Sequence, residues 1–372
     1  MRPESKIMGR PLGSGPSRLA GDSGADMTIE YRFVFNFAAS YSGGGYKRLH
    51  EYAKWFNENG GAWFVIHSRC ADLTTEFPNN KFFIARQSRI GRLYNDSGYL
   101  KTIREGMGCS PELHYSYGIP LYSRFGRINW FHLSNVLPFR TARVPLSPVG
   151  RLKAAYLGRK IRAGFDKADV ISAESKSSLT LLDRGVSEKL FLSVNGSDDE
   201  IAHLQVKAVV DKENIATVVG TTTYKALEDS FRVFEMLKTT NPDLKLMVIG
   251  NPNWIPHALR GRDGVVICGS LARAAVMDCL RKSRYYISTT CIENSYNAAS
   301  EGIFLADESY ISDIGPHREL LVRETFDIVS VPGVGRTLLK VRRESLSGVN
   351  LKSWNTVVGE MIARYREAAA HR

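Results

Sequence analysis

The chain has 372 residues, of which 43% are hydrophobic and 24% are charged, so a collagen-like repeat and wholesale disorder are excluded. At about 150 residues per domain the length predicts two domains, and no apolar run reaches the roughly 18 residues of a membrane-spanning helix. The net charge of +12 favours a polyanionic partner: a nucleic acid, a phosphorylated small molecule or an anionic membrane.

The cysteines and the first residues indicate the cellular setting of the protein rather than its fold. The five cysteines are odd in number and form no Cys-x-x-Cys pair, so neither a disulfide framework nor a zinc knuckle is indicated. We therefore expect a reducing, cytoplasmic setting. Residues 1–26 are rich in Gly, Pro, Ser and Arg and lack an apolar segment, which predicts a disordered leader rather than a secretory signal.

The first half of the chain alternates short apolar strands with helices. The run Arg32–Phe37 is typical of a buried strand, and a glycine-rich turn at residues 42–45 follows it. A helix over Tyr46–Asn59 and a strand at Ala62–Ile66 complete a βαβ unit. Further strands are expected at Lys81–Ile84, Ile128–Leu133 and Val170–Ala173.

The second half repeats this alternation. Strands are expected at Ile215–Val219, Leu244–Ile249, Val265–Cys268 and Tyr285–Ser288, and helices at Glu228–Lys238 and Arg273–Lys282. Such an order predicts parallel sheets with helices on both faces. We expect an N-terminal domain over residues 27–200, a C-terminal domain over residues 201–345 and a final helical segment over residues 346–372. Ligands of such sheets bind beyond the carboxyl ends of the strands.

The sharpest motif is a pair of glutamates, Glu293 and Glu301, separated by seven residues. The pair follows the strand at Tyr285–Ser288 and runs into a helix, about one turn inside which Glu301 is expected. A carboxylate accepts two hydroxyl hydrogen bonds, as the vicinal diol of a sugar requires, and a helix start offers N–H groups to an anion. Spacing alone nevertheless favours two solvated glutamates.

Other segments favour a binding role for the two glutamates over two solvated side chains, because of the order in which these segments occur along the chain. They are Ala168–Ser175, Val194–Asp198, Val219–Gly220 with Lys225, Val248–Gly250, Ile267–Gly269 and Ser312–Glu319. Together with the glutamate pair they resemble the retaining GT-B glycosyltransferases of family four, the "glycosyl transferases group 1". The resemblance implies two Rossmann-like α/β lobes that face each other across a cleft, with a C-terminal helix that crosses back to the N-terminal lobe.

The resemblance also implies site residues. Glu293, His132 and Lys225 would be catalytic, with the Lys225 cation stabilising charge on a leaving diphosphate. The implied donor-binding residues are Gly44, Gly45, Gly220, Thr221, Lys225, Gly250, Asn294, Ser295, Tyr296, Asn297 and Glu301. A solvated loop lysine and a buried core histidine are the plain alternatives for Lys225 and His132.

Some positions depart from the family pattern. Thr221 stands where the family usually has a phosphate-binding arginine, and Asn294 and Tyr296 replace glycines. Arg281 and Arg318 are candidates for the missing charge, and an inactive relative is an alternative. No Asp-x-Asp motif occurs, which favours a site without a metal.

Residues 140–162 hold seven Lys or Arg and no Asp or Glu. Only Tyr156 is interleaved, so the aromatic platforms that single-stranded nucleic acid needs are missing. A solvated helix face is the plain alternative. We expect Arg151, Lys153, Arg159 and Lys160 to contact a lipid-linked acceptor or an anionic membrane.

The sequence thus predicts a metal-independent, retaining hexosyltransferase whose donor is a nucleotide-diphosphate sugar and which has no further cofactor. The acceptor would be a saccharide or a lipid-linked saccharide of bacterial lipopolysaccharide or surface-polysaccharide synthesis. The enzyme would be cytoplasmic, peripheral on the inner face of the plasma membrane, and would bind no nucleic acid. Two rivals stay open. A GT-B-like sugar-nucleotide epimerase needs no acceptor, and a basic nucleic-acid-binding protein would show steep salt dependence.

Overall fold

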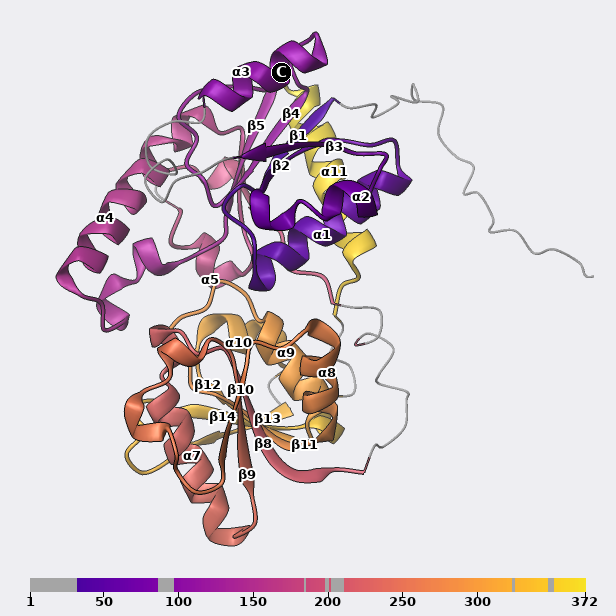
Figure 1. Cartoon of the computed structure of the whole chain (residues 1–372). Coiled ribbons are helices and arrows are strands. Elements are labelled where there is room, and N and C mark those ends of the chain that lie inside the picture. The colour runs from indigo at the N-terminus through magenta and orange to yellow at the C-terminus, as the bar shows by residue number, and fades with distance from the viewer. Residues whose placement is uncertain are drawn as a thin grey trace, which may run out of the picture.

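The structure is a computed structural model that describes residues 32–85, 97–183, 185–197, 201, 211–322, 325–346 and 351–372, with side chains of the 97–107 helix described from Leu100 onward. The predicted leader, Asp198 of the segment Val194–Asp198 and the predicted boundary after residue 200 lie outside the described residues. Residues 193–197, which follow the last strand of the first lobe, are called the linker below. The described chain forms two lobes, each built on a sheet with helices on both faces (Figure 1). The α/β prediction with two Rossmann-like lobes is confirmed.

The N-lobe, residues 32–197, contains a parallel sheet in the order β3-β2-β1-β4-β5-β6-β7. Its strands are β1 (Phe33–Asn36), β2 (Trp63–His67), β3 (Lys81–Ala85), β4 (Leu113–Tyr117), β5 (Ile128–Leu133), β6 (Val170–Ala173) and β7 (Leu190–Leu192). Its helices are α1 (Gly43–Glu58), α2 (Leu73–Glu76), α3 (Ser97–Met107), α4 (Pro148–Ala163) and α5 (Lys176–Leu179). Side chains alternate across each strand. Phe33 and Phe35 therefore pack against α1, and Val34 packs on the face that α3 covers.

The C-lobe, residues 213–346, contains a sheet in the order β10-β9-β8-β11-β12-β14-β13. Its strands are β8 (Glu213–Val219), β9 (Lys245–Ile249), β10 (Val265–Gly269), β11 (Ser283–Ser288), β12 (Glu308–Ser312), β13 (Phe326–Val329) and β14 (Leu338–Arg342). Its helices are α7 (Leu227–Thr240), α8 (Arg273–Lys282), α9 (Asn297–Leu305) and α10 (Gly315–Leu320). The apolar residues of α7 fill one face of the sheet, and those of α8 and α9 fill the other.

The last helix, α11 (Trp354–Ala370), lies on the N-lobe and not on the C-lobe that precedes it in the chain (Figure 1). Trp354, Met361 and Tyr365 are buried in the aromatic core beside α1, and the Tyr365 ring lies 4.7 Å from that of Phe33. The two interlobe connections meet where the backbone N–H of Ser197 donates to the carbonyl of Lys352 over 2.9 Å. The predicted crossover of the C-terminal helix is confirmed.

Several elements differ from the sequence-based expectations. The central strand β4 was not predicted, because its sequence LHYSY carries His114 and Ser116, which are nevertheless buried. The prediction of wholly parallel sheets was wrong for the C-lobe, since β14 runs antiparallel to both β12 and β13. Of the predicted glycine turn at residues 42–45, Ser42 is the N-cap of α1 and the three glycines begin the helix instead.

Candidate functional site

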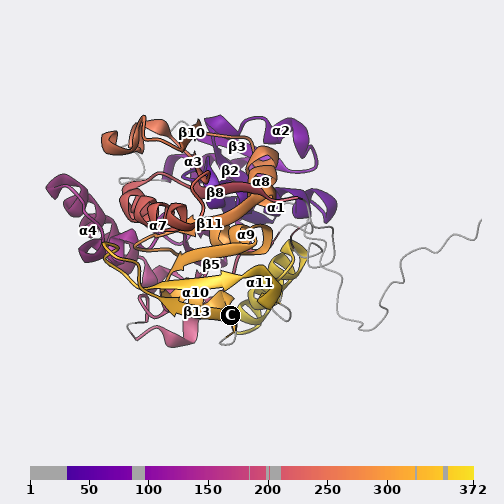
Figure 2. The same cartoon turned by 90° about the horizontal axis from the view of Figure 1, so that it is seen from below.

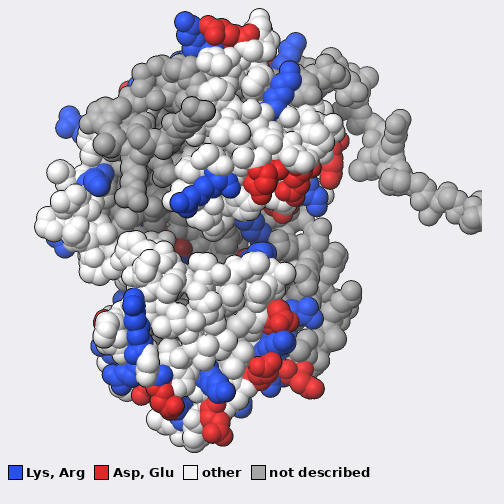
Figure 3. Space-filling model, viewed as in Figure 1, with Lys and Arg blue, Asp and Glu red and all other residues white. Residues whose placement is uncertain are grey.

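A cavity of about 340 Å³ lies between the lobes, beyond the carboxyl ends of β1, β4, β5 and β6 on one side and of β8 and β11 on the other. Figure 3 shows the hollow between the lobes on this face. Eight of the predicted site residues line this interlobe cavity: Gly44, Gly45, Gly220, Lys225, Glu293, Asn294, Ser295 and Asn297. The lining residues that were not predicted site residues include Tyr117, Ser134, Asn135 and Glu174.

Lys225 and Glu293 form an ion pair in this cavity. Both side chains are mostly buried, with exposed fractions of 14% and 22%. Burial alone would lower the pKa of Lys225, but the negative charge and hydrogen bond of Glu293 raise it above its ordinary value. Lys225 is therefore a fixed cation at neutral pH, in the place where the sequence predicts the donor diphosphate.

The backbone around Lys225 is shaped to hold it. Gly220, at the end of β8, has a φ of +95°, and a Cβ there would lie 3.0 Å from the Lys225 Cε. Ala226 adopts a left-handed φ of +48°, which is rare for a residue with a side chain. The hydroxyl of Thr289 donates to the Ala226 carbonyl over 2.8 Å and holds this turn.

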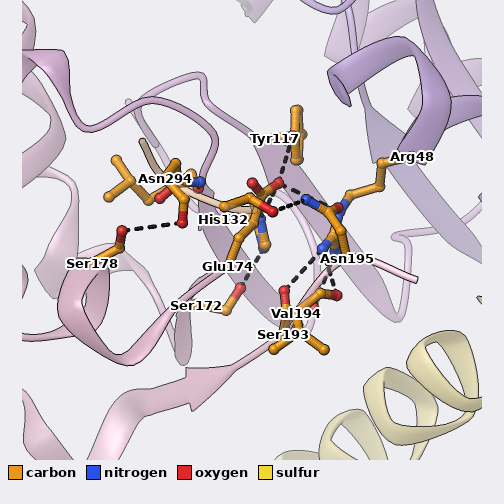
Figure 4. Close-up of polar contacts among 12 residues, drawn as sticks. Arg48, Tyr117, His132, Ser172, Glu174, Ser178, Ser193, Val194, Asn195 and Asn294 are labelled. Atoms are coloured by element: carbon orange, nitrogen blue, oxygen red, sulfur yellow. Dashed lines mark hydrogen bonds and ion pairs between the residues drawn. The ribbon is translucent and has the colours of Figure 1, made fainter. Parts of the chain in front are cut away.

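Two amide side chains join the lobes across the cavity. The Asn294 side chain donates to the Leu133 carbonyl over 2.7 Å, and the Ser178 hydroxyl donates to the Asn294 carbonyl over 3.2 Å (Figure 4). Asn195, in the linker, donates to the Ser295 hydroxyl over 2.7 Å. Asn294 therefore makes a contact between the lobes for which a glycine has no side chain.

Glu301 lies in the second turn of α9, as predicted, and only 5% of it is exposed. Its carboxylate is 2.7 Å from the guanidinium of Arg273 and 3.6 Å from the amine of Lys47, which lies on α1 of the other lobe. Glu301 does not line the interlobe cavity. Glu301 is therefore an ion-paired carboxylate at the edge of the predicted donor site. The alternative of a solvated glutamate is wrong for this residue.

His132, predicted to be catalytic, is fully buried and does not line the cavity. Its ring stacks on Tyr117 at 5.0 Å, and burial lowers its pKa to about 4, so the ring is neutral at pH 7. The indole N–H of Trp130 donates to the Ser172 hydroxyl over 2.7 Å, and the same hydroxyl lies 2.8 Å from His132 Nδ1. The other ring nitrogen, Nε2, faces Glu174.

Glu174 is a charged residue of the cavity that the sequence analysis did not predict as a site residue. It follows β6 and is 4% exposed, and Tyr117 donates to its Oε1 over 2.8 Å (Figure 4). The Oε1 atom also lies 3.5 Å from His132 Nε2 and 3.7 Å from Arg48 Nε. Burial alone would raise the pKa of Glu174, but His132, Arg48 and Tyr117 together lower it, so the group is a carboxylate. Its position directly after a predicted strand was the available signal.

Arg48, on α1, is fully buried and ties Glu174 to the linker between the lobes. Its guanidinium donates to the carbonyls of Ser193 and Val194 over 2.8 and 2.9 Å and to the Asn195 side chain over 3.1 Å. A buried cation with this many acceptors is compensated where it lies. The linker is thereby attached to the wall of the cavity.

The remaining predicted residues lie outside the cavity. Thr221 donates to the Asn251 carbonyl over 2.9 Å, and Gly250 packs against the Thr221 side chain. Tyr296 precedes α9. Neither candidate for the missing arginine lines the cavity, and Arg318 is paired with Asp313 over 2.7 Å.

The predicted acceptor or membrane residues Arg151, Lys153, Arg159 and Lys160 all lie on α4. Figures 1 and 2 both place this helix at the edge of the molecule away from α11. The four residues do not line the cavity.

Comparisons with known proteins identify the architecture. No family profile and no curated protein matches this chain. Sucrose-phosphate synthase from Thermosynechococcus elongatus aligns with a TM-score of 0.61 at 12% identity, over 91% of this chain and 99% of its own. A glycosyltransferase from Rickettsia africae gives 0.59 at 12%, over 91% and 98%. HepE from Anabaena in complex with UDP-glucose gives 0.55 at 14%, over 91% and 92%. At these identities the likeness shows the fold, and the chain has the GT-B fold.

Proposed function

We propose that the chain is a glycosyltransferase that moves a sugar from a nucleotide-diphosphate sugar to a saccharide or lipid-linked acceptor. The observation that carries the proposal is the Lys225–Glu293 pair in a cavity between two GT-B lobes. A nucleotide sugar presents a diphosphate for a fixed cation and hydroxyls for carboxylates and amides. The similar structure of HepE was solved in complex with UDP-glucose, which favours a UDP-sugar as the first donor to test.

The proposed step has a simple charge balance. The bond between the anomeric carbon and the phosphate oxygen breaks, and its electron pair stays on the phosphate. Lys225 stabilises that developing charge from a largely water-excluded position. The acceptor oxygen bonds to the anomeric carbon, and its proton passes to the departing phosphate. Bonding of the acceptor oxygen on the same face that the phosphate leaves gives retention of configuration, which we propose on the family resemblance.

We further propose that the reaction needs no metal or other cofactor, because Lys225 and the backbone N–H groups at the start of α9 neutralise the diphosphate.

The setting that we propose is cytoplasmic assembly of bacterial lipopolysaccharide or surface polysaccharide, again on the resemblance. Within the described residues, no helix has both the length and the apolar character to cross a bilayer.

A peripheral contact with an anionic membrane through α4 is part of the proposal. Val149 and Leu152 on this helix are 61% and 72% exposed, beside the exposed cations Arg151 and Lys153. Figure 3 shows Lys and Arg side chains along this outer edge of the N-lobe. Apolar side chains among cations suit the interface of an anionic leaflet.

A thermal-shift screen with UDP-, GDP- and dTDP-sugars tests the proposal, because a ligand that binds the folded state raises the melting temperature. We expect one nucleotide class to stabilise the protein. No shift with any nucleotide sugar would contradict the proposal. Conversion of the bound sugar without any added acceptor would favour the epimerase reading, and salt-sensitive binding of nucleic acid alone would favour the other rival.

A further inference from the structure

Glu174 is a buried carboxylate on the N-lobe wall of the interlobe cavity, and the reaction proposed above does not use it. Its side chain is 5% exposed. Lys225 and Glu293 line the same cavity from the C-lobe. A carboxylate is rarely buried without a partner for each oxygen, because the loss of hydration is costly. The partners of each oxygen are therefore informative.

The protein contacts of this carboxylate converge on one oxygen. Tyr117, His132 and Arg48 approach Oε1 at 2.8, 3.5 and 3.7 Å (Figure 4). No hydrogen bond joins Oε2 to any residue that the structure describes. An ionised carboxylate only accepts hydrogen bonds, so Oε2 is available to accept one from a molecule bound in the cavity.

The surrounding groups fix the direction of Oε2. Tyr117 is anchored by stacking on His132 at 5.0 Å, and Arg48 is anchored by the linker carbonyls. Because these groups hold Oε1, the carboxylate cannot rotate freely. The pKa of Glu174 is lowered by the same neighbours, so the charge is present at neutral pH.

We propose that Glu174 Oε2 accepts a hydrogen bond from a hydroxyl of the transferred sugar and thereby selects and positions that sugar. This inference rests on the proposed function. Lys225 holds the diphosphate end of the donor, and the cavity that it lines continues to Glu174, so the sugar beyond the diphosphate meets this wall. The partner is a hydroxyl-rich sugar, and an anionic group facing Glu174 is disfavoured by like charge.

The test compares the nucleoside diphosphate with the nucleotide sugar that stabilises the protein most in the screen. Glu174→Gln keeps the shape and removes the charge. Glu174→Asp keeps the charge beside Arg48 but withdraws it from the cavity. It is the second test variant and replaces Glu174→Gln if that variant does not fold. Glu188→Gln, at an exposed glutamate of the N-lobe, is the matched control.

We expect both Glu174 variants to bind the diphosphate within twofold of the wild type by calorimetry and the nucleotide sugar at least tenfold more weakly. Glu188→Gln should change neither. Wild-type affinity of folded Glu174 variants for the nucleotide sugar would overturn the inference and leave the proposed function standing. So would a change confined to the Michaelis constant of the acceptor. Failure of the wild type to bind any nucleotide sugar would overturn the proposed function and the inference together.

Discussion

The side-chain amide of Asn294 in the C-lobe donates to the carbonyl of Leu133, the last residue of β5 in the N-lobe, over 2.7 Å. Both partners are buried, and the Asn294 carbonyl accepts in turn from Ser178 of the N-lobe. The turn that carries the predicted donor site is thus fastened to the opposite lobe at two atoms. The Asn294 contact is one of several that join the lobes, beside those of Lys176 and Ser177 with Glu319 and of Asn195 with Ser295.

Asn294→Gly should loosen the two lobes, because the Leu133 carbonyl loses its donor. We expect a larger radius of gyration by small-angle scattering and a loss of about 1 kcal/mol in the free energy of unfolding. Asn251→Ala is the matched control, since the Asn251 side chain accepts from Asn253 within the C-lobe and, among the described residues, makes no hydrogen bond to the N-lobe. An unchanged radius of gyration would show that the amide does not hold the lobes.

Lys225→Ala should lower kcat by about 100-fold or more and change the donor Michaelis constant by less than tenfold, because the charge on the phosphate is greatest in the transition state. Lys225→Arg, which keeps the charge, should recover part of the rate. Steady-state kinetics with the identified donor measures both. Lys245→Ala, at an exposed lysine of β9, is the control, and a normal turnover in Lys225→Ala would remove this residue from the chemistry.

Glu301→Ala should weaken binding of the nucleoside diphosphate, because a ribose diol would lose a charged acceptor worth about 1.5–3 kcal/mol, which is roughly 10- to 150-fold in affinity. Calorimetric titration measures this loss. Arg273 and Lys47 already contact the carboxylate, so the ribose must share it with them. Glu235→Ala, at an exposed glutamate of α7, is the control, and wild-type affinity in Glu301→Ala would exclude the ribose role.

Replacing Arg151, Lys153, Arg159 and Lys160 with Gln should reduce co-sedimentation with anionic vesicles. Each cation near such a surface contributes roughly 1 kcal/mol, and this contribution decays within a Debye length. Activity on a soluble acceptor should survive, because α4 does not line the cavity. The control replaces four cations of the C-lobe, Lys245, Arg262, Lys282 and Arg284. An equal loss of vesicle binding in both variants would mean that the net charge of the protein, and not the position of the cations on α4, determines binding.

The free energy of unfolding should fall as the pH drops from about 6.5 to about 4. Burial lowers the pKa of both His114 and His132 from 6.5 to about 4. Between these values the unfolded chain binds protons that the folded chain does not, so acid favours unfolding. At 1.36 kcal/mol per pKa unit, each histidine accounts for about 3 kcal/mol. Urea unfolding at several pH values measures the slope, which His114→Asn should reduce. A flat profile would contradict buried, neutral histidines.

Much of the fold was predictable because its strands are short apolar runs that follow a regular βα order. The helix at Arg273–Lys282 and the strand at Val170–Ala173 match the expected limits. The strand β4 was not predictable from hydropathy, because the polar groups of His114 and Ser116 are buried by the surrounding fold. Ser116, for example, donates to the Ile119 carbonyl over 2.7 Å.

The candidate site was predictable where the chain keeps local motifs, and less so where distant residues combine. Lys225 and Glu293 were found from their motifs, and the structure brings them together. The signal for Glu174 was only its position after a predicted strand, and Arg48 carries no local signal, because their environment comes from β4, β5 and the linker, which are far apart in sequence. For His132 the sequence predicted the right part of the N-lobe, but the side chain lies behind Tyr117 and Glu174.

The position of α11 affects the order in which the protein assembles as it is made. The aromatic core of the N-lobe contains Trp354, Val357, Val358, Met361, Ile362 and Tyr365, yet the rest of that core lies between Phe33 and Val170. At about 5–20 residues per second, a ribosome takes roughly 10–30 s to pass from the end of the N-lobe sheet to α11. During that interval the groove beside α1 has no helix to cover it. The lobe that is synthesised first is therefore the lobe that is completed last, and its open aromatic groove is the surface that a chaperone would meet on the nascent chain.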